Sequence, residues 1–193
     1  MKIRQLGDNK LEKKSKPVKN IKDKNIQDLI DNMLHICYGH EKSTGGLAAP
    51  QVGKNLRILI ARRVDIEEKY KKLGKKISKY LDRKLWEVVI NPKTLKKGRR
   101  KSTFWEGCLS VKKGKVFGPV KRSSFVKLEY SDRTGAKHIL PAFDFFAHII
   151  LHEIDHLNGI LFVKYIKNPE NLWRDKALNE YIDKHDEFPD VKN

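Results

Sequence analysis

The chain has 193 residues, of which 42 are Lys or Arg and 24 are Asp or Glu, so its formal net charge is +18. This length fits one domain with extensions and is enough to bury a hydrophobic core. Apolar runs such as residues 149–151 are far shorter than the roughly 20 residues of a membrane-spanning helix, which excludes that class of protein. Residues 1–14 are charged and lack the apolar stretch of a secretory signal, so we expect a cytoplasmic protein with no membrane partner.

The positive charge is concentrated in residues 69–76, 93–101 and 112–122. Clustered Lys and Arg side chains release counterions when they bind a phosphate backbone, which favours contact with RNA or with the ribosome. Such segments are equally typical of a solvated surface in a lysine-rich protein, and no aromatic-rich RNA-binding motif accompanies them. Both interpretations of the charge stay open.

The first element predicted in chain order is an amphipathic helix over residues 25–38, whose apolar residues recur at helical spacing. Cys37 lies on its apolar face, where we expect it to be a small buried hydrophobic residue. Residues 56–61 and 86–90 are predicted to be buried strands. Between these strands, a lysine-rich pattern with helical spacing indicates a basic, partly helical insertion over residues 65–84.

The second half of the chain begins with a predicted hairpin, in which residues 125–130 and 137–140 flank a turn. After Pro141 the pattern becomes helical through Leu157. A last amphipathic helix is predicted to begin with Pro169 in its first position. Strands and helices that are arranged in this way indicate the α+β class.

The strongest local motif runs from His152 to His156 and has Glu153 in its second position. Two histidines four positions apart lie on the same face of a helix, so both imidazoles can bind one metal ion, with the glutamate beside them as a base. The surrounding helix is apolar, and polar side chains crowded onto it would be costly without a partner. The motif therefore predicts a metal site on this helix.

Two histidines leave a metal ion under-coordinated, so a third protein ligand is required. Cys108 offers a soft thiolate on a segment that includes a glycine, and we favour it. Glu180 lies downstream on the last predicted helix, faintly like the third ligand of thermolysin-type proteases. His148 lies one helical turn before His152. These two residues stay open as alternatives.

Three segments of the chain together resemble the motifs of the peptide deformylase family. Residues 44–51 are similar to the family's Gly-x-Gly-x-Ala-Ala-x-Gln stretch, and residues 106–110 to its Glu-Gly-Cys-x-Ser segment. Residues 151–156 are similar to the family's metal-binding helix, and the three segments occur in the family's order. The chain departs from these motifs at Thr44, where the family has glycine, and at Leu151, where it has glutamine.

The resemblance implies an α+β fold in which mixed or antiparallel strands pack around a central metal-binding helix, with helices near both ends of the chain. It covers residues 1–165, which we interpret as a peptide deformylase-like catalytic domain with the basic insertion at 65–84. Residues 166–193 are then a C-terminal helical tail. The implied activity is that of a metal-dependent hydrolase, which removes the N-formyl group from the N-terminal formylmethionine of nascent polypeptides.

The resemblance also assigns a metal site by position. Cys108, His152 and His156 would hold one divalent ion. Fe(II) is the ion that the family implies, with Zn, Ni or Co able to replace it. One thiolate and two imidazoles are chemically compatible with all four metals, so the sequence does not select among them.

The catalytic roles that the resemblance implies fall on four residues. Glu153 would be the general acid/base, and the Gln51 amide together with the backbone N–H of Leu109 would stabilise the oxyanion. Gly46 would contact the substrate backbone. We expect an apolar pocket for the methionine side chain, with walls near Ile149, Leu109 and Gly46.

Two other functions stay open from the sequence. One is a zincin-type metallopeptidase in which Glu180 completes the metal site. The other is a basic ribosome- or RNA-binding protein with a structural metal, in which His148 supplies a fourth ligand. Metal retention separates the deformylase from the peptidase, because loss of Cys108 would release the metal from the former only.

Overall fold

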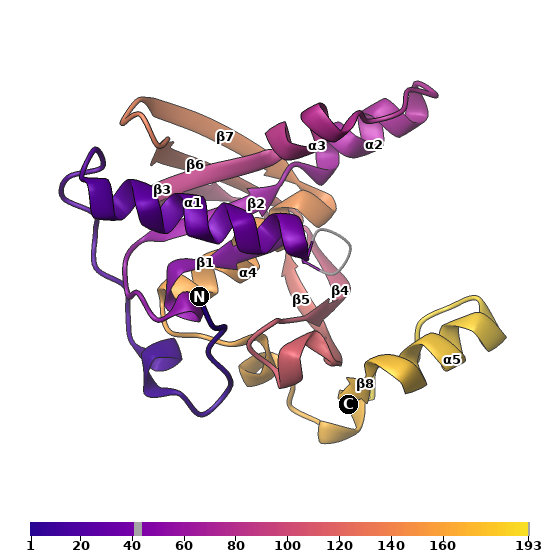
Figure 1. Ribbon diagram of the computed structural model, residues 1–193. Helices are drawn as coiled ribbons and strands as arrows, with labels where there is room; N and C mark the ends of the chain where they lie inside the picture. Colours follow the sequence, from indigo (N-terminus) through magenta and orange to yellow (C-terminus); the bar gives the residue numbers. More distant parts are fainter. Residues whose placement is uncertain (41–43, 193) are drawn as a thin grey trace.

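The computed structural model describes residues 1–40 and 44–192 (Figure 1). Its helices in this part of the chain are α1 (Lys24–Gly39), α2 (Val64–Lys72), α3 (Lys79–Lys84), α4 (Asp144–Leu157) and α5 (Asp175–His185). The strands are β1 (Gly46–Ala48), β2 (Ile58–Arg62), β3 (Trp86–Lys97), β4 (Lys101–Gly107), β5 (Val116–Ser123), β6 (Phe125–Ser131), β7 (Lys137–Phe143) and β8 (Trp173–Arg174). No helix of the described residues combines the length and the apolar character that a membrane crossing requires.

The strands form two sheets on either side of α4. The larger sheet has the order β1-β2-β3-β6-β7 and the smaller has the order β4-β5-β8. Neighbouring strands are antiparallel in both sheets. Helix α4 contacts β1, β2, β6 and β7 of the larger sheet and β4 and β5 of the smaller. The predicted α+β fold around a central helix is therefore confirmed.

The two faces of β2 divide the hydrophobic core. Side chains alternate across a strand, so Ile58 and Ile60 lie in the cluster with α1, whereas Leu59 and Ala61 lie in the cluster with α4. Helix α1 buries Cys37 completely, which confirms the prediction for that residue. Figure 1 shows α1 crossing the face of the larger sheet. The His152–His156 motif on α4 is thus held between two layers of strands.

The predicted start of the central helix was wrong. The helix begins at Asp144, and Pro141 belongs to β7, where it lies opposite Lys127 of β6. Proline cannot donate to a strand ladder, which confines it to edge strands. Since β7 is the last strand in the order of its sheet, proline is tolerated at this position.

The predicted start of the last helix was also wrong. Pro169 begins a single 3-10 turn, and the Asn168 side chain caps this turn. The chain then extends to form β8, which pairs with the first two residues of β5. Helix α5 starts only after this strand, so the C-terminal segment joins the smaller sheet before it becomes helical.

The insertion between β2 and β3 contains the short helices α2 and α3, and Gly74, with a φ of 65°, lies between them. Arg62 at the end of β2 pairs with Glu67 at 2.8 Å and with Asp82 at 2.6 Å. One guanidinium therefore joins both helices to the sheet. Figure 1 shows α2 and α3 projecting from one end of the larger sheet.

Candidate active site

Three polar side chains of α4 meet a loop cysteine at the centre of the molecule. His152, Glu153 and His156 are 8%, 3% and 1% exposed. The two imidazole rings lie one turn apart, with their centroids 4.9 Å from each other. Cys108 follows β4, and its Sγ lies 3.3 Å from His156 Nε2. Among the described residues, one ligand atom from each of Cys108, His152 and His156 lies within 4.8 Å of the others.

Gly107 explains how the cysteine reaches this position. A Cβ at residue 107 would lie 2.5 Å from Cε1 of Phe117, which belongs to the neighbouring strand β5. Glycine therefore lets β4 end in close contact with that ring. The following residue, Cys108, then lies beside α4.

Glu106 fixes the orientation of His152. His152 Nδ1 lies 2.7 Å from Glu106 Oε2, so this nitrogen donates its proton to the carboxylate and Nε2 is left to bind a metal. Arg122 donates to both carboxylate oxygens, at 2.5 Å and 3.1 Å. Burial alone raises the pKa of Glu106, but the hydrogen bonds from His148, His152 and Arg122 outweigh it and hold that pKa well below its usual range.

Sequence reasoning missed the roles of Glu106 and Arg122. Arg122 was counted in a basic surface segment, yet it is 7% exposed and also pairs with Asp155 of α4 at 2.5 Å. Arg122 lies two positions after the buried Val120 on one strand, so the two side chains are on the same face. This spacing was a signal that Arg122 faces inward. Glu106, two positions before the cysteine, was quoted only as part of a motif.

Glu153 has the environment of a proton carrier. Its side chain is buried, and no described residue bonds to its Oε2. Burial raises the pKa of Glu153 to about 7, because the ionised form loses its hydration. The carboxyl group can therefore exchange a proton near neutral pH.

Gln51 presents its amide NH₂ to the same centre. Its Oε1 accepts a hydrogen bond from the Ala48 N–H at 2.8 Å, which fixes the direction of the amide. Its Nε2 lies 3.4 Å from Cys108 Sγ and 3.3 Å from Ser110 Oγ. The N–H of Leu109 has no acceptor among the described residues. Two donors near the cysteine are thus positioned by the fold.

Gly46 is needed for the approach of Glu153. A Cβ at residue 46 would lie 2.6 Å from Glu153 Oε1, so a larger residue would displace the carboxylate. Thr44, which stands where the family motif has glycine, donates from its hydroxyl to the Gly46 carbonyl at 2.6 Å. This departure from the motif therefore adds a bond inside the loop and touches none of the three metal-site residues.

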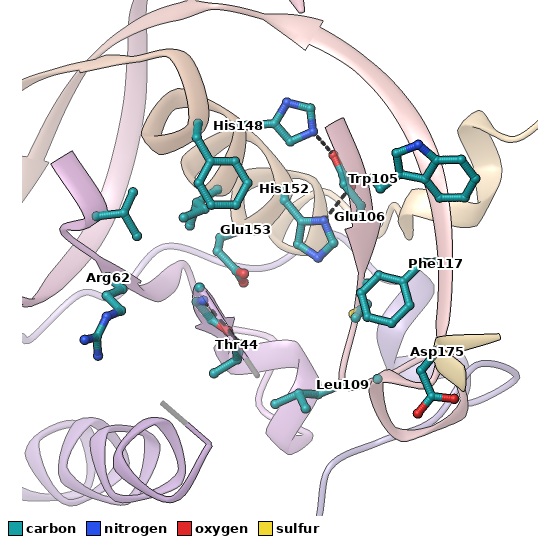
Figure 2. A pocket seen from close by; sticks show the side chains of 18 of the residues that line it. Thr44, Arg62, Trp105, Glu106, Leu109, Phe117, His148, His152, Glu153 and Asp175 are labelled. Atoms are coloured by element: carbon teal, nitrogen blue, oxygen red, sulfur yellow. Dashed lines mark hydrogen bonds and ion pairs between the residues drawn. The ribbon is translucent and has the colours of Figure 1, made fainter. Parts of the chain in front are cut away.

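A cavity of about 1010 Å³ opens beside the group. Gly46, Leu109 and Ile149 line it, together with His152 and Glu153. All three residues predicted to be near a substrate pocket therefore line one cavity. Figure 2 shows His152 and Glu153 side by side at its centre, with Leu109 and Phe117 among the surrounding side chains.

The two alternative ligands lie outside the group of converging donors. Glu180 is exposed on α5, with its nearest charged partner, Lys176, at 3.8 Å. His148 is buried, but its Nε2 contacts Glu106 Oε1. Neither the peptidase arrangement nor a fourth histidine ligand is present among the described residues.

The donor set fits one divalent ion. His nitrogen and Cys sulfur bind a metal ion at distances of about 2.0 to 2.3 Å. Three such donors on one ion therefore lie within a few ångströms of one another, as these three do. Burial lowers the pKa of His156 well below its ordinary value, which keeps that imidazole in the neutral form that binds metal. Three protein ligands leave a coordination position open, as in catalytic sites.

The fold and the site are those of a metal-dependent hydrolase, in which one cysteine and two histidines converge beside a buried glutamate. The family model described as polypeptide deformylase matches residues 1–172. The chain belongs to the polypeptide deformylase family, whose enzymes use a divalent metal to remove the N-formyl group from nascent polypeptides.

Individual relatives agree with this assignment. The chain is 38% identical over 178 residues to the peptide deformylase of Chlorobaculum parvum, covering 92% of this chain and 85% of that protein. It is 34% identical over 176 residues to that of Rhizobium meliloti, covering 91% and 88%. The crystal structure of the Ehrlichia chaffeensis peptide deformylase in complex with actinonin is 30% identical, with a TM-score of 0.72 over 96% of this chain and 97% of that chain.

Proposed function

We propose that this chain deformylates formylmethionyl peptides with Cys108, His152 and His156 as metal ligands and Glu153 as the general acid/base. The observation that carries the proposal is the convergence of the three donors beside a buried, partly unpartnered carboxyl group at a cavity. When bound there, a divalent ion lowers the pKa of water from about 16 to about 7 and polarises a carbonyl.

The identity of the metal is a further part of the proposal. We propose Fe(II) as the native ion, with Zn, Ni or Co able to replace it. Support comes from the thiolate and the two imidazoles, a mixed set that suits late first-row divalent metals. Metal analysis of protein purified without oxygen would identify the ion.

Glu153 moves the proton in the proposed reaction. Its carboxylate takes a proton from the attacking water, and the resulting acid delivers that proton to the amine of the departing peptide. A pKa of about 7 suits both steps at neutral pH, because neither protonation state is strongly disfavoured. The nearby Gly46 backbone supports this role by leaving room for the carboxyl group.

Gln51 and the Leu109 N–H would stabilise the negative charge that develops on the formyl oxygen. The fixed direction of the Gln51 amide supports this role, since a donor that is already oriented needs no reorganisation during the reaction. A donor of this kind contributes about 3 kcal/mol to transition-state stabilisation. The backbone of Gly46 would contact the substrate, and Ile149 and Leu109 would contact the methionine side chain.

The experiment that tests the proposed function is anaerobic hydrolysis of a formyl-Met tripeptide by Fe(II)-reconstituted protein. We expect release of formate and of the free amine, with no cleavage of internal peptide bonds. Zn, Ni and Co forms serve as comparisons for the metal. Cleavage of internal bonds, or no formate release with any of the four metals, would contradict the proposal.

We also propose that the domain boundary lies near residue 165 and that the tail is packed on the catalytic domain. The tail contributes β8 to the smaller sheet, and Leu178 of α5 is 3% exposed. We therefore expect Leu178→Ala to lower the free energy of unfolding by about 2 to 3 kcal/mol. Calorimetry should show one transition at a lower Tm, whereas Leu73→Ala, at a residue 60% exposed, should leave Tm unchanged. A tail that unfolds separately would contradict its packing on the catalytic domain.

Ribosome contact is the last part of the proposal. The lysines of residues 69–76 are all exposed on the projecting insertion, which supports an electrostatic partner. We expect co-sedimentation with ribosomes that weakens as salt rises, because bound counterions are released on binding. A Lys71→Glu, Lys75→Glu, Lys76→Glu variant should lose at least about tenfold in ribosome affinity while hydrolysing the tripeptide normally. No co-sedimentation at low salt would contradict the contact.

A further inference from the structure

His148 is a buried histidine of α4 to which the proposed mechanism gives no role. It is 2% exposed and lies one helical turn before His152. Its ring and that of Phe104 on β4 form a T-shaped pair, with the centroids 4.9 Å apart and the planes at 73°. Burial of an imidazole is costly unless a polar partner compensates for the lost water.

The partner of His148 is the carboxylate that orients a metal ligand. His148 Nε2 contacts Glu106 Oε1, and His152 Nδ1 lies 2.7 Å from Glu106 Oε2. Figure 2 shows Glu106 joined to both histidines by dashed lines. The carboxylate is therefore shared between the ligand His152 and the non-ligand His148.

Three side chains converge on the two oxygens of the Glu106 carboxylate. A carboxylate offers about two lone-pair directions on each oxygen. Arg122 donates to both oxygens, His152 Nδ1 donates to Oε2, and His148 Nε2 contacts Oε1. With this pattern, rotation of the carboxylate would break bonds that no other described donor replaces.

We propose that His148 is a positioning residue: by occupying Oε1 it holds the Glu106 carboxylate in the plane from which Oε2 accepts the His152 proton. His152 Nε2 then stays directed toward Cys108 and His156. The inference rests on the proposed function, since it concerns the same metal site. Leu151, where the family motif has glutamine, lies in the apolar core and cannot supply such a bond.

The test uses two substitutions at residue 148, one that keeps the aromatic ring and one that keeps a hydrogen-bond donor. His148→Phe preserves an aromatic ring against Phe104 but removes the donor, whereas His148→Gln retains a donor. We expect the Phe variant to bind Co(II) about 10- to 100-fold more weakly in chelator competition, the range typical of outer-shell changes. The Gln variant should lie within about threefold of the wild type. Co(II) affinity of the Phe variant equal to that of the wild type would overturn the proposal.

A control separates positioning from general destabilisation of the helix. Leu151→Ala removes a buried core side chain of α4 without touching Glu106, so it should lower Tm while leaving Co(II) affinity unchanged. Equal losses of Co(II) affinity in Leu151→Ala and His148→Phe would overturn a specific role.

A second measurement needs neither metal nor activity. In the metal-free protein, we expect a slowly exchanging Nδ1–H proton of His152 by ¹H–¹⁵N NMR in the wild type and in His148→Gln. The same proton should exchange rapidly with solvent in His148→Phe. Unchanged protection in His148→Phe would overturn the proposal. A protein that shows the expected exchange pattern but releases no formate would contradict the proposed function alone.

Discussion

Replacing Glu153 with glutamine is expected to lower kcat/KM for a formyl-Met tripeptide by about 1,000-fold, within the range of general acid–base catalysis. Glutamine keeps the size of the side chain but cannot take a proton from water or return one to the leaving amine. Glu153 is not one of the three converging metal-site residues, so metal content should stay at the wild-type level. Steady-state kinetics and metal analysis on the same samples check both parts.

The matched control for this substitution is Glu180→Gln. Glu180 lies exposed on α5, and the same chemical change there should leave kcat/KM within about twofold of the wild type, as for most surface substitutions. A Glu153→Gln variant that kept more than a tenth of the wild-type rate would show that another group carries the proton. Loss of metal together with activity would instead show that Glu153 supports the ligand set.

Local sequence patterns were sufficient to predict helices in which successive turns make the same kind of contact. Helical spacing over residues 25–38 predicted α1, because each turn of this helix meets the same face of the sheet. The spacing of His152 and His156 predicted the shared face of α4, since a helix fixes that geometry without help from the rest of the fold.

Two element boundaries failed because pairing with distant strands decided them. Pro141 was predicted to precede a helix, but pairing with β6 keeps that stretch in an edge strand. Pro169 is a favourable first residue of a helix, yet the chain after it pairs with β5 and delays α5. Local propensity is a weak prior, and tertiary contacts override it where a sheet edge is available.

The roles of Glu106 and Arg122 beside the metal site could not be predicted from the sequence for a similar reason. Glu106 lies 16 positions from Arg122 and 46 from His152, and no repeating pattern relates such separations. The carboxylate joins a strand of the smaller sheet to α4, so its role exists only after the two have packed together. Motif matching located the converging side chains, while their orientation required the fold.

Replacing Cys108 with alanine is expected to lower metal affinity by more than about 100-fold, the upper range for outer-shell changes, because a direct ligand is removed. Two donors hold the Cys108 sulfur in place: Gln51 Nε2 and the N–H of Ser110 are each 3.4 Å from Sγ. Without sulfur, two imidazoles remain, too few for a stable site. Metal content after gel filtration with a mild chelator measures the loss.

Cys37 provides a matched control for this substitution, because it is the same residue type and is also buried. It lies on α1 in the apolar core, so Cys37→Ala should cost stability through lost packing and leave one equivalent of metal bound. A Cys108→Ala protein that retained its metal, beside a Glu180→Ala protein that lost it, would contradict the ligand set and favour the peptidase arrangement. The same substitution at the two cysteines therefore separates loss of a metal ligand from loss of packing, because the residue type is the same and only the surroundings differ.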